Sequence, residues 1–407
     1  MKNSNVEKEI IGKILDFSNP YKALEEKVLV KDKEIIIFNN DRITFKKPIL
    51  ISVGKAAIPM ARFFMDRIEI DRKLIVTPKG TGSGNEVIES GHPLPDENSI
   101  RAGEEAIRLL STYDYDLVIF LISGGASALF EYSEVPLDDL REINRVLISS
   151  GLDINSINIV RKHLSKIKGG KIINYVKENV PIISFIVSDV PGNDLSSIGG
   201  GLTALDSSTV DDALFLLKKL NLEKYSKYLE ETPKKFTHIV KNLIILDNMT
   251  VLKKLANYLG NSLILTSEVK GEAKDLGIFL ASIYNSIENY GLPLKRPYHL
   301  LLGGEPEVSI SKKAGKGGRN GEVCLSFLKY VKKGNYFELL AFATDGIDGN
   351  SDYAGCFINS DIKISKDEID QALENHSSYE LLEKYNTVIK TGYTYTNVNN
   401  IYVLKAP

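Results

Sequence analysis

Short apolar runs rich in Ile, Val and Leu alternate with amphipathic segments along the chain, and this alternation constrains the fold more than any other feature. The runs that predict strands lie at residues 48–53, 73–77, 117–123, 181–189, 242–247, 262–267, 299–304, 338–344 and 401–405. Helical periodicity predicts helices at residues 1–17, 136–149, 158–177, 271–289 and 322–333. Buried strands that alternate with helices are typical of α/β layers on mostly parallel sheets.

The chain has 407 residues, which is long for a single hydrophobic core, so we expect two domains. The most polar long segment between strand groups is residues 222–238. We therefore place the domain boundary near residue 235, with an N-terminal domain of residues 1–235 and a C-terminal domain of residues 236–407.

The composition excludes several classes of protein. Lys and Arg (51) nearly balance Asp and Glu (53), so no global charge indicates nucleic-acid binding. The apolar runs are too short to cross a membrane, and the first residues lack the apolar core of a signal peptide. Cys324 and Cys356 cannot form a disulfide framework and lack metal-ligand spacing, which fits a reducing cytoplasm.

Glycine and polar residues follow directly after several predicted strands. These sequences are GKAA at 54–57, GGAS at 124–127, VPGND at 190–194, GEPE at 304–307 and DGIDG at 345–349. Open α/β sheets bind their ligands at the carboxyl ends of the strands. Turn formation alone poorly explains why glycine and polar residues follow five different strands, so we expect a binding site at these strand ends.

The glycine-rich turns do not match the familiar signatures. Ala56 stands where a Walker A loop needs Ser or Thr, and Asn85 ends an incomplete G-x-G-x-x-G dinucleotide fingerprint. Leu129 replaces the last glycine of a G-x-S-x-G nucleophile elbow. A calcium loop that begins at Asp348 fails because Asn359 stands in place of the bidentate Glu.

Cations and backbone amides at these strand ends indicate an anion site. Lys55 opens a helix, where a cation opposes the helix dipole, so a phosphate or carboxylate partner is favoured over a solvated lysine. A turn at a helix start offers amides for an anion; its residues are Ser123, Gly124, Gly125, Ala126 and Ser127. Arg161 lies in a basic segment, and Arg319 with Asn320 lies in a glycine-rich loop that we expect to be very flexible. Each segment has an ordinary alternative: a capped turn for residues 123–127, a basic solvated face for the segment of Arg161, and a mobile surface loop for Arg319 and Asn320.

Carboxylates accompany these cations. Asp189 and Asp194 flank a Pro-Gly turn, where they could act as a base, hold Mg²⁺ or only form the turn. Glu305 follows a strand directly, and Asp345 is the stronger candidate of its loop for facing phosphates. Asp348 could simply brace the turn or a nearby backbone amide. Cations, amides and carboxylates together are the groups that phosphoryl transfer requires.

An ordered set of motifs resembles the glycerate kinases of the MOFRL type, which include archaeal and bacterial glycerate 2-kinases. The motifs are VGKAA (53–57), GHPLPDENS (91–99), SGGASAL (123–129), NIVRKHLSKIKGG (158–170), SDVPGND (188–194), GGEPEV (303–308), GGRNGE (317–322), TDGIDG (344–349) and TNVNN (396–400). They occur in the family's order and span nearly the whole chain. The resemblance implies phosphorylation of D-glycerate to 2-phosphoglycerate with ATP and Mg²⁺, in the cytoplasm, by an enzyme that could be a homodimer.

The resemblance also implies an α/β fold in two parts. These are a Rossmann-like three-layer N-terminal domain and a smaller mixed α/β C-terminal (MOFRL) domain, with the active site in the cleft between them. Residues 1–44 could pack on the C-terminal domain.

The same resemblance implies a role for each site residue. The catalytic residues would be Lys55, Asp189 and Arg319. Substrate and phosphate would be bound by Ser123, Gly124, Gly125, Ala126, Ser127, Arg161, Asn193 and Asn320. The nucleotide would contact Lys55, Gly200, Gly201, Glu305 and Gly317, and Mg²⁺ would be held by Asp189, Asp194, Glu305 and Asp345.

Two other functions remain open at this point. One is a hydroxypyruvate reductase-type oxidoreductase, against which the incomplete dinucleotide fingerprint argues. The other is a non-catalytic protein that binds a sugar acid or a nucleotide, against which the retained charged residues argue.

Overall fold

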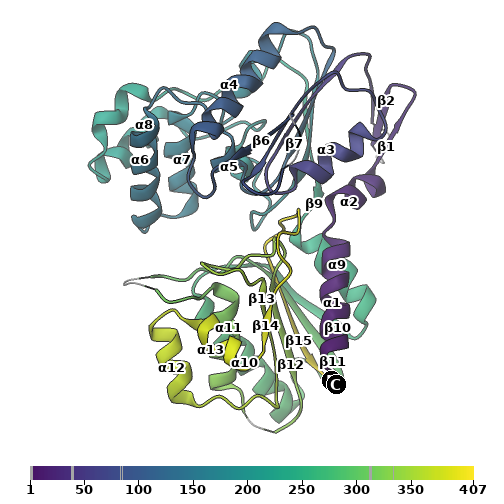
Figure 1. Ribbon diagram of the computed structural model, residues 1–407, viewed down its shortest axis with the longest axis vertical. Helices are drawn as coiled ribbons and strands as arrows, with labels where there is room; N and C mark the ends of the chain where they lie inside the picture. The colour runs from purple at the N-terminus through teal and green to yellow at the C-terminus, as the bar shows by residue number, and fades with distance from the viewer. Residues whose placement is uncertain (1–2, 38–40, 83, 85, 311–313, 333) are drawn as a thin grey trace. The chain divides into compact units, whose positions relative to one another are not determined.

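The computed structural model describes residues 3–37, 41–82, 84, 86–310, 314–332 and 334–407 (Figure 1). Residues 83 and 85 of the incomplete dinucleotide fingerprint, and residues 1, 2 and 333 of the predicted helices, lie outside the described residues. The chain forms two compact units. The N-terminal unit consists of Pro20–Asp189 and Asn193–Ile245. The C-terminal unit consists of Leu246–Pro407, Val190–Gly192 and the segment that ends at Asn19.

The N-terminal unit is built on a six-stranded sheet with the order β6-β5-β4-β7-β8-β9. The strands are β4 (Pro48–Val53), β5 (Arg72–Pro78), β6 (Val87–Ser90), β7 (Leu117–Ile122), β8 (Ile182–Val187) and β9 (Val240–Leu246). Every residue of β4, β7 and β8 is buried, as a parallel sheet covered on both faces requires. The predicted parallel α/β arrangement of this half is confirmed.

Helices and a small antiparallel sheet complete this unit. The helices are α2 (Pro20–Lys27), α3 (Ala57–Met65), α4 (Glu97–Thr112), α5 (Ala126–Leu129), α6 (Leu137–Ser149), α7 (Ile154–Leu164) and α8 (Val210–Lys219). Three short 3₁₀ helices are η1 (Lys171–Tyr175), η2 (Ile198–Gly200) and η3 (Glu223–Tyr228). The small sheet contains β1 (Val28–Lys31), β2 (Glu34–Ile37) and β3 (Arg42–Thr44).

The predicted helix over residues 158–177 is wrong in its second half. Helix α7 ends at Leu164, and Ser165 is extended. Gly169 and Gly170 have φ angles of 60° and 81°, which a right-handed helix cannot contain. The apolar periodicity of the sequence continues past Leu164 because the residues that follow are also buried, but they form a turn and not a helix.

The C-terminal unit has a six-stranded mixed sheet with the order β10-β11-β15-β12-β13-β14. The strands are β10 (Ser262–Val269), β11 (Tyr298–Gly304), β12 (Glu338–Ala343), β13 (Gly355–Asn359), β14 (Val388–Ile389) and β15 (Asn400–Ala406). Strands β10 and β11 are parallel, and the other pairs are antiparallel. The predicted mixed α/β character of this half is therefore confirmed.

Helices cover both faces of this mixed sheet. Helices α1 (Asn3–Phe17) and α9 (Asn248–Leu259) lie on one face, while α10 (Ala273–Tyr290), α11 (Arg319–Tyr330), α12 (Lys366–Glu374) and α13 (Ser378–Lys384) lie on the other (Figure 1). The segment after α1 is anchored because the Thr396 hydroxyl donates to the Ser18 carbonyl oxygen over 2.6 Å.

The two cysteines form a disulfide that the sequence analysis did not predict. Cys324 of α11 and Cys356 of β13 are bonded, with their Cα atoms 6.7 Å apart and 32 residues between them in sequence. A single bridge is not a framework, but it shows that cysteine count alone was a poor guide to pairing. Among the described residues, no helix combines the length and apolar character needed to span a membrane.

Candidate active site

The strand order of the N-terminal sheet reverses between β4 and β7. The chain runs from β4 outward through β5 to β6, and from β7 outward through β8 to β9. The loops after β4 and β7 therefore leave the sheet in opposite directions, and such a switch point is where open α/β sheets bind ligands. Lys55 follows β4 and the SGGAS turn follows β7, so the fold brings these two predicted site segments together.

Backbone hydrogen bonds hold the two segments in contact. The Lys55 N–H donates to the Gly124 carbonyl oxygen over 2.9 Å, and the Ser123 N–H donates to the Val53 carbonyl oxygen over 3.0 Å. The Ala56 N–H donates to Ser123 Oγ over 3.0 Å. Ser123 is completely buried, so its hydroxyl serves to join the two loops.

Glycine is required where these loops cross. Gly54 has a φ angle of +118°, and a Cβ there would lie 2.3 Å from Ser123 Oγ. We expect Gly54→Ala to destabilise the fold, by about 1–3 kcal/mol from backbone strain alone, and to displace Lys55. Urea unfolding followed by circular dichroism measures this cost, and Gly12→Ala is the matched control because a Cβ there meets nothing within 4 Å. Equal stability of the two variants would contradict this packing argument.

The helix that follows the SGGAS turn is very short. Helix α5 contains only Ala126–Leu129, and Phe130 is already extended. A single turn contributes little dipole, so an anion here would depend on backbone amides and Lys55. Gly125 is left-handed, while Ser127 is partly exposed.

His92 is a further neighbour of this region and was not among the predicted site residues. A Cβ placed on Gly125 would lie 3.2 Å from Cδ2 of His92 and 3.5 Å from Cγ of Lys55. The exposed imidazole follows β6 and flanks the same turn as the lysine. Its position in the GHPLPDENS motif was the signal that could have found it.

The loop after β8 carries Asp189, Asn193 and Asp194. Asp189 is partly exposed and Asn193 is left-handed, with a φ angle of 60°. Asp194 accepts hydrogen bonds from the Ser196 N–H and hydroxyl, at 3.0 and 2.9 Å, and from the Ser197 hydroxyl at 2.6 Å. Burial opposes ionisation of Asp194, but these hydrogen bonds outweigh it and lower its pKa. The turn-forming alternative therefore accounts for the contacts of Asp194.

Gly200 and Gly201 lie in the interior of the N-terminal unit. Both are left-handed, and a Cβ at Gly200 would lie 2.6 Å from the Lys168 side chain. Their carbonyl oxygens accept from the Gly169 and Gly170 N–H groups at 2.9 and 2.8 Å. These contacts explain the glycines by packing, and the predicted nucleotide contact stays a prediction.

The basic segment 158–170 is not a solvated face. Lys168 is 1% exposed and pairs with the buried Glu131, while Lys162 pairs with the buried Asp206 over 2.6 Å. Arg161 Nε donates to Asn144 Oδ1 over 2.7 Å. Burial lowers the pKa of Arg161, and Glu131 opposes this change. The solvated alternative is therefore wrong for this segment.

In the C-terminal unit, Arg319 and Asn320 do not belong to a flexible loop, which corrects the sequence-based expectation. They begin helix α11, where Asn320 is fully buried and donates to Asn400 Oδ1 over 2.8 Å. Gly317 is also buried, and its N–H donates to Asn350 Oδ1 over 2.9 Å. Glycine-rich sequence was mistaken for mobility, whereas these glycines allow close packing.

Arg319 lies between two carboxylates. Its Nη1 donates to Glu305 Oε1 over 2.8 Å, and its Nε lies 3.9 Å from Asp348 Oδ1. Burial alone would lower the pKa of Arg319, but Glu305 and Asp348 raise it above its ordinary value. Arg319 is therefore a fixed cation, and its side chain is still 31% exposed.

The DGIDG loop separates its two aspartates. Asp345 is partly exposed, and its Oδ1 accepts from the Ile347 N–H at 3.2 Å. Asp348 is 1% exposed and accepts from the Asn320 N–H at 2.8 Å, so the prediction that it braces a backbone amide agrees with its geometry. Burial raises the pKa of Asp348 to about 6, although hydrogen bonds and Arg319 oppose this rise.

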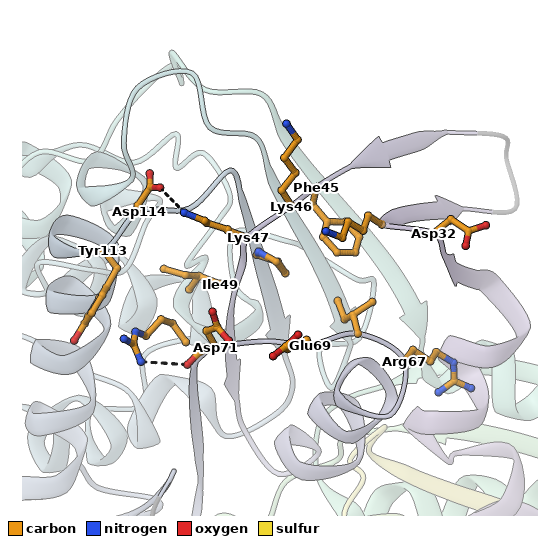
Figure 2. A pocket seen from close by; sticks show the side chains of 14 residues that line it. Asp32, Phe45, Lys46, Lys47, Ile49, Arg67, Glu69, Asp71, Tyr113 and Asp114 are labelled. Atoms are coloured by element: carbon orange, nitrogen blue, oxygen red, sulfur yellow. Dashed lines mark hydrogen bonds and ion pairs between the residues drawn. The ribbon is translucent and has the colours of Figure 1, made fainter.

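A surface hollow of about 480 Å³ lies elsewhere in the N-terminal unit (Figure 2). It is lined by the beginning of β4, at Pro48 and Ile49, and by Asp71 and Arg72 at the beginning of β5. A parallel sheet has its strand beginnings and strand ends at opposite edges. The hollow contains none of the predicted site residues and is not the candidate active site.

The described residues contain no group of three or more His, Cys, Asp or Glu side chains arranged to hold a metal. This finding is compatible with Mg²⁺, which proteins commonly bind through one or two carboxylates together with substrate phosphates and water. Glu305 and Asp345 follow β11 and β12, and their exposure fits that kind of site.

Comparison with known proteins places the chain in a family. A family model described as a domain of unknown function, DUF4147, matches residues 6–232, and the MOFRL family model matches residues 298–400. The two halves thus define a protein of the DUF4147–MOFRL type, and the chain belongs to that family.

Relatives with known names agree over almost the full length. The glycerate 2-kinase of Sulfurisphaera tokodaii is 55% identical, over 98% of this chain and 99% of the relative. The glycerate 2-kinase of Pyrococcus horikoshii is 36% identical, over 97% of this chain and 95% of the relative. A crystal structure of glycerate kinase from Thermotoga maritima has a TM-score of 0.84 and 33% identity, and the match covers 99% of this chain and 100% of that one.

Proposed function

We propose that this protein is a glycerate 2-kinase that transfers the terminal phosphoryl group of ATP to the 2-hydroxyl of D-glycerate. The observation that carries the proposal is the 55% identity to a glycerate 2-kinase over 98% of the chain. The arrangement of the site supports it, because Lys55 meets a glycine-rich turn at the switch point of the N-terminal sheet.

The groups have distinct tasks in this proposal. Lys55 and the amides of residues 123–127 would hold an anionic group of a substrate, and Asp189 would orient or deprotonate the accepting hydroxyl. Arg319 would stabilise charge on the transferred phosphoryl group. We propose that both domains contribute to this one site, in a cleft between them.

Mg²⁺ is part of the proposal. Asp345 and Glu305 would be its protein ligands, with Asp189 and Asp194 as further candidates. The ion would neutralise phosphate charge when ATP is bound.

The test of function is 31P NMR of the products formed from D-glycerate, ATP and Mg²⁺. We expect 2-phosphoglycerate and ADP. The method can identify them because 2- and 3-phosphoglycerate have different 31P shifts. Absence of any phosphorylated glycerate would contradict the proposal. A parallel assay for NADH oxidation with hydroxypyruvate reports the oxidoreductase alternative, and glycerate binding without product would indicate a binding protein.

Removal of divalent metal provides a separate prediction. Excess EDTA should abolish phosphoryl transfer, since the phosphates would lose their counter-ion, and added Mg²⁺ should restore it. 31P NMR of samples stopped by acid before and after addition of Mg²⁺ measures ADP and phosphoglycerate in both steps without metal-dependent coupling enzymes. The melting temperature, followed without substrates, is the control, and we expect EDTA to leave it unchanged. Full turnover in EDTA would contradict the proposed metal dependence.

A further inference from the structure

The buried carboxylate of Asp348 caps a helix to which it does not belong. Helix α11 begins after Gly318, which has no side chain to accept from the first N–H groups of the helix. Asp348, in the loop between β12 and β13, accepts from the Asn320 N–H over 2.8 Å. A carboxylate at a helix N-terminus satisfies an otherwise unpaired donor and interacts favourably with the helix dipole.

The two oxygens of Asp348 face different groups. Oδ2 accepts from the Asn320 N–H and from the Tyr379 hydroxyl, the latter at 2.5 Å. Oδ1 accepts no hydrogen bond from the described part of the chain, and Arg319 Nε lies 3.9 Å from it. One carboxylate thus fixes the start of the helix and also presents a negative charge to the first side chain of that helix.

The loop can approach the helix this closely only because two glycines meet there. A Cβ at Gly318 would lie 2.4 Å from Asp348 Oδ2. Gly349 has a φ angle of +63°, and a Cβ there would lie 2.1 Å from the Gly317 carbonyl oxygen. The arrangement is therefore specific to this pair of segments and leaves Asp348 few alternative positions.

Arg319 is held from two directions as a result. Glu305, which follows β11, binds its Nη1 atom, and Asp348 lies beside its Nε atom. Tyr402 of β15 is a further buried polar side chain of this environment, and the Asp348 charge raises its pKa in addition to the larger effect of burial. A guanidinium held at two edges keeps one orientation, which is what a charge-stabilising group needs.

We propose that Asp348 is a positioning residue for Arg319, acting by capping α11 and by holding the guanidinium in the orientation that phosphoryl transfer requires. The inference rests on the proposed function, because it concerns the use of Arg319 in that reaction. Asp348 itself would touch neither substrate.

The test compares three changes around Asp348. Asp348→Asn preserves size and an acceptor for the Asn320 N–H but removes the charge. Tyr379→Phe removes one donor to Asp348 and keeps the ring. Asp352→Asn is the matched control, since Asp352 lies in the same loop but is 54% exposed and pairs with Lys316 and Lys390.

We expect Asp348→Asn to lower kcat by about 100-fold, because a small displacement of a catalytic group has effects of this size, and to change KM much less. Tyr379→Phe should have a smaller effect in the same direction, and Asp352→Asn should behave as wild type. In an Arg319→Lys background, the effect of Asp348→Asn on kcat should largely disappear, since the guanidinium that Asp348 positions is no longer present.

Three results would overturn the inference. They are an unchanged kcat in a folded Asp348→Asn protein, an undiminished effect of that change in the Arg319→Lys background, and an equal loss in Asp352→Asn. Calorimetric titration with ATP provides a readout that does not need turnover: Asp348→Asn should weaken ATP binding by much less than 100-fold in the wild-type background, and should leave it unchanged in the Arg319→Lys background. A wild-type protein that binds ATP but shows no turnover would contradict the proposed function, and the titration would still show whether Asp348 acts through Arg319.

Discussion

Lys55→Ala is expected to lower kcat by about 1,000-fold in phosphorylation of D-glycerate, the largest loss of activity that we predict for a single substitution. Lys55 is the cation at the switch point of the N-terminal sheet, next to the amides of the SGGAS turn. A positioned charge in a partly buried site supplies several kcal/mol to the transition state, and water does not replace it. ADP release and 31P NMR both measure the loss.

The matched control is Lys46→Ala. Lys46 is exposed and lines the hollow at the opposite edge of the same sheet (Figure 2). The Lys46→Ala variant therefore loses the same kind of side chain and charge without a change at the candidate site. We expect normal turnover from this variant. Lys55→Ala changes only the side chain and leaves the backbone hydrogen bonds of the two loops in place, so its melting temperature should remain close to that of wild type. Near-normal activity in folded Lys55→Ala would remove Lys55 from the mechanism.

Glu131→Ala should cause the largest loss of stability, about 3–5 kcal/mol, because it leaves a buried charge without its partner. Lys168 is 1% exposed, and Glu131 is its ion-pair partner. Burial lowers the pKa of Lys168, while Glu131 counteracts this shift. Urea unfolding at constant pH measures the change in the free energy of unfolding.

Two controls test this explanation. Asp352→Ala breaks the exposed pairs of that residue and should leave the free energy of unfolding almost unchanged, because solvent screens exposed ion pairs. Adding Lys168→Met to Glu131→Ala should recover much of the loss, because the unpaired charge is then gone. A double variant as unstable as Glu131→Ala would show that a cavity, and not the charge, is responsible.

The pH dependence of Glu131→Ala has a definite sign. Without Glu131, the folded-state pKa of Lys168 falls further below its unfolded value, so the unfolded chain binds more protons between these two values. The free energy of unfolding should therefore increase with pH in that window, relative to wild type. A destabilisation that does not depend on pH would contradict this account.

Local sequence was sufficient for the long buried strands and for the loops that follow them. The run 117–122 is apolar at every position and the run 48–53 at every position except Ser52, and a strand buried on both faces is the element that accommodates such runs. Lys55 and the SGGAS turn could be placed at one edge because parallel strands end at the same edge of a sheet. The shorter strands β1, β2, β3, β6, β13 and β14 were missed because they are brief or partly polar and depend on pairing with neighbours.

Glycine-rich segments were the main source of error. The loop before Arg319 reads as mobile, yet it is packed against Asp348 and the His376 carbonyl oxygen. The segment 165–170 reads as helix, yet positive φ angles at Gly169 and Gly170 turn it into a buried loop. Glycine permits both mobility and close approach, and only the neighbours decide between them.

The class of fold, the strand ends that carry the chemistry and the resemblance to one family could be predicted from the residues alone, because these depend on local composition and order. Which charged residues have partners is apparent only in the folded chain. Lys168 and Asp348 look like surface residues in sequence, but one is paired in the interior and the other caps a helix from a distant loop. The free energy of a charge depends on its burial and on groups remote in sequence, which no local pattern encodes.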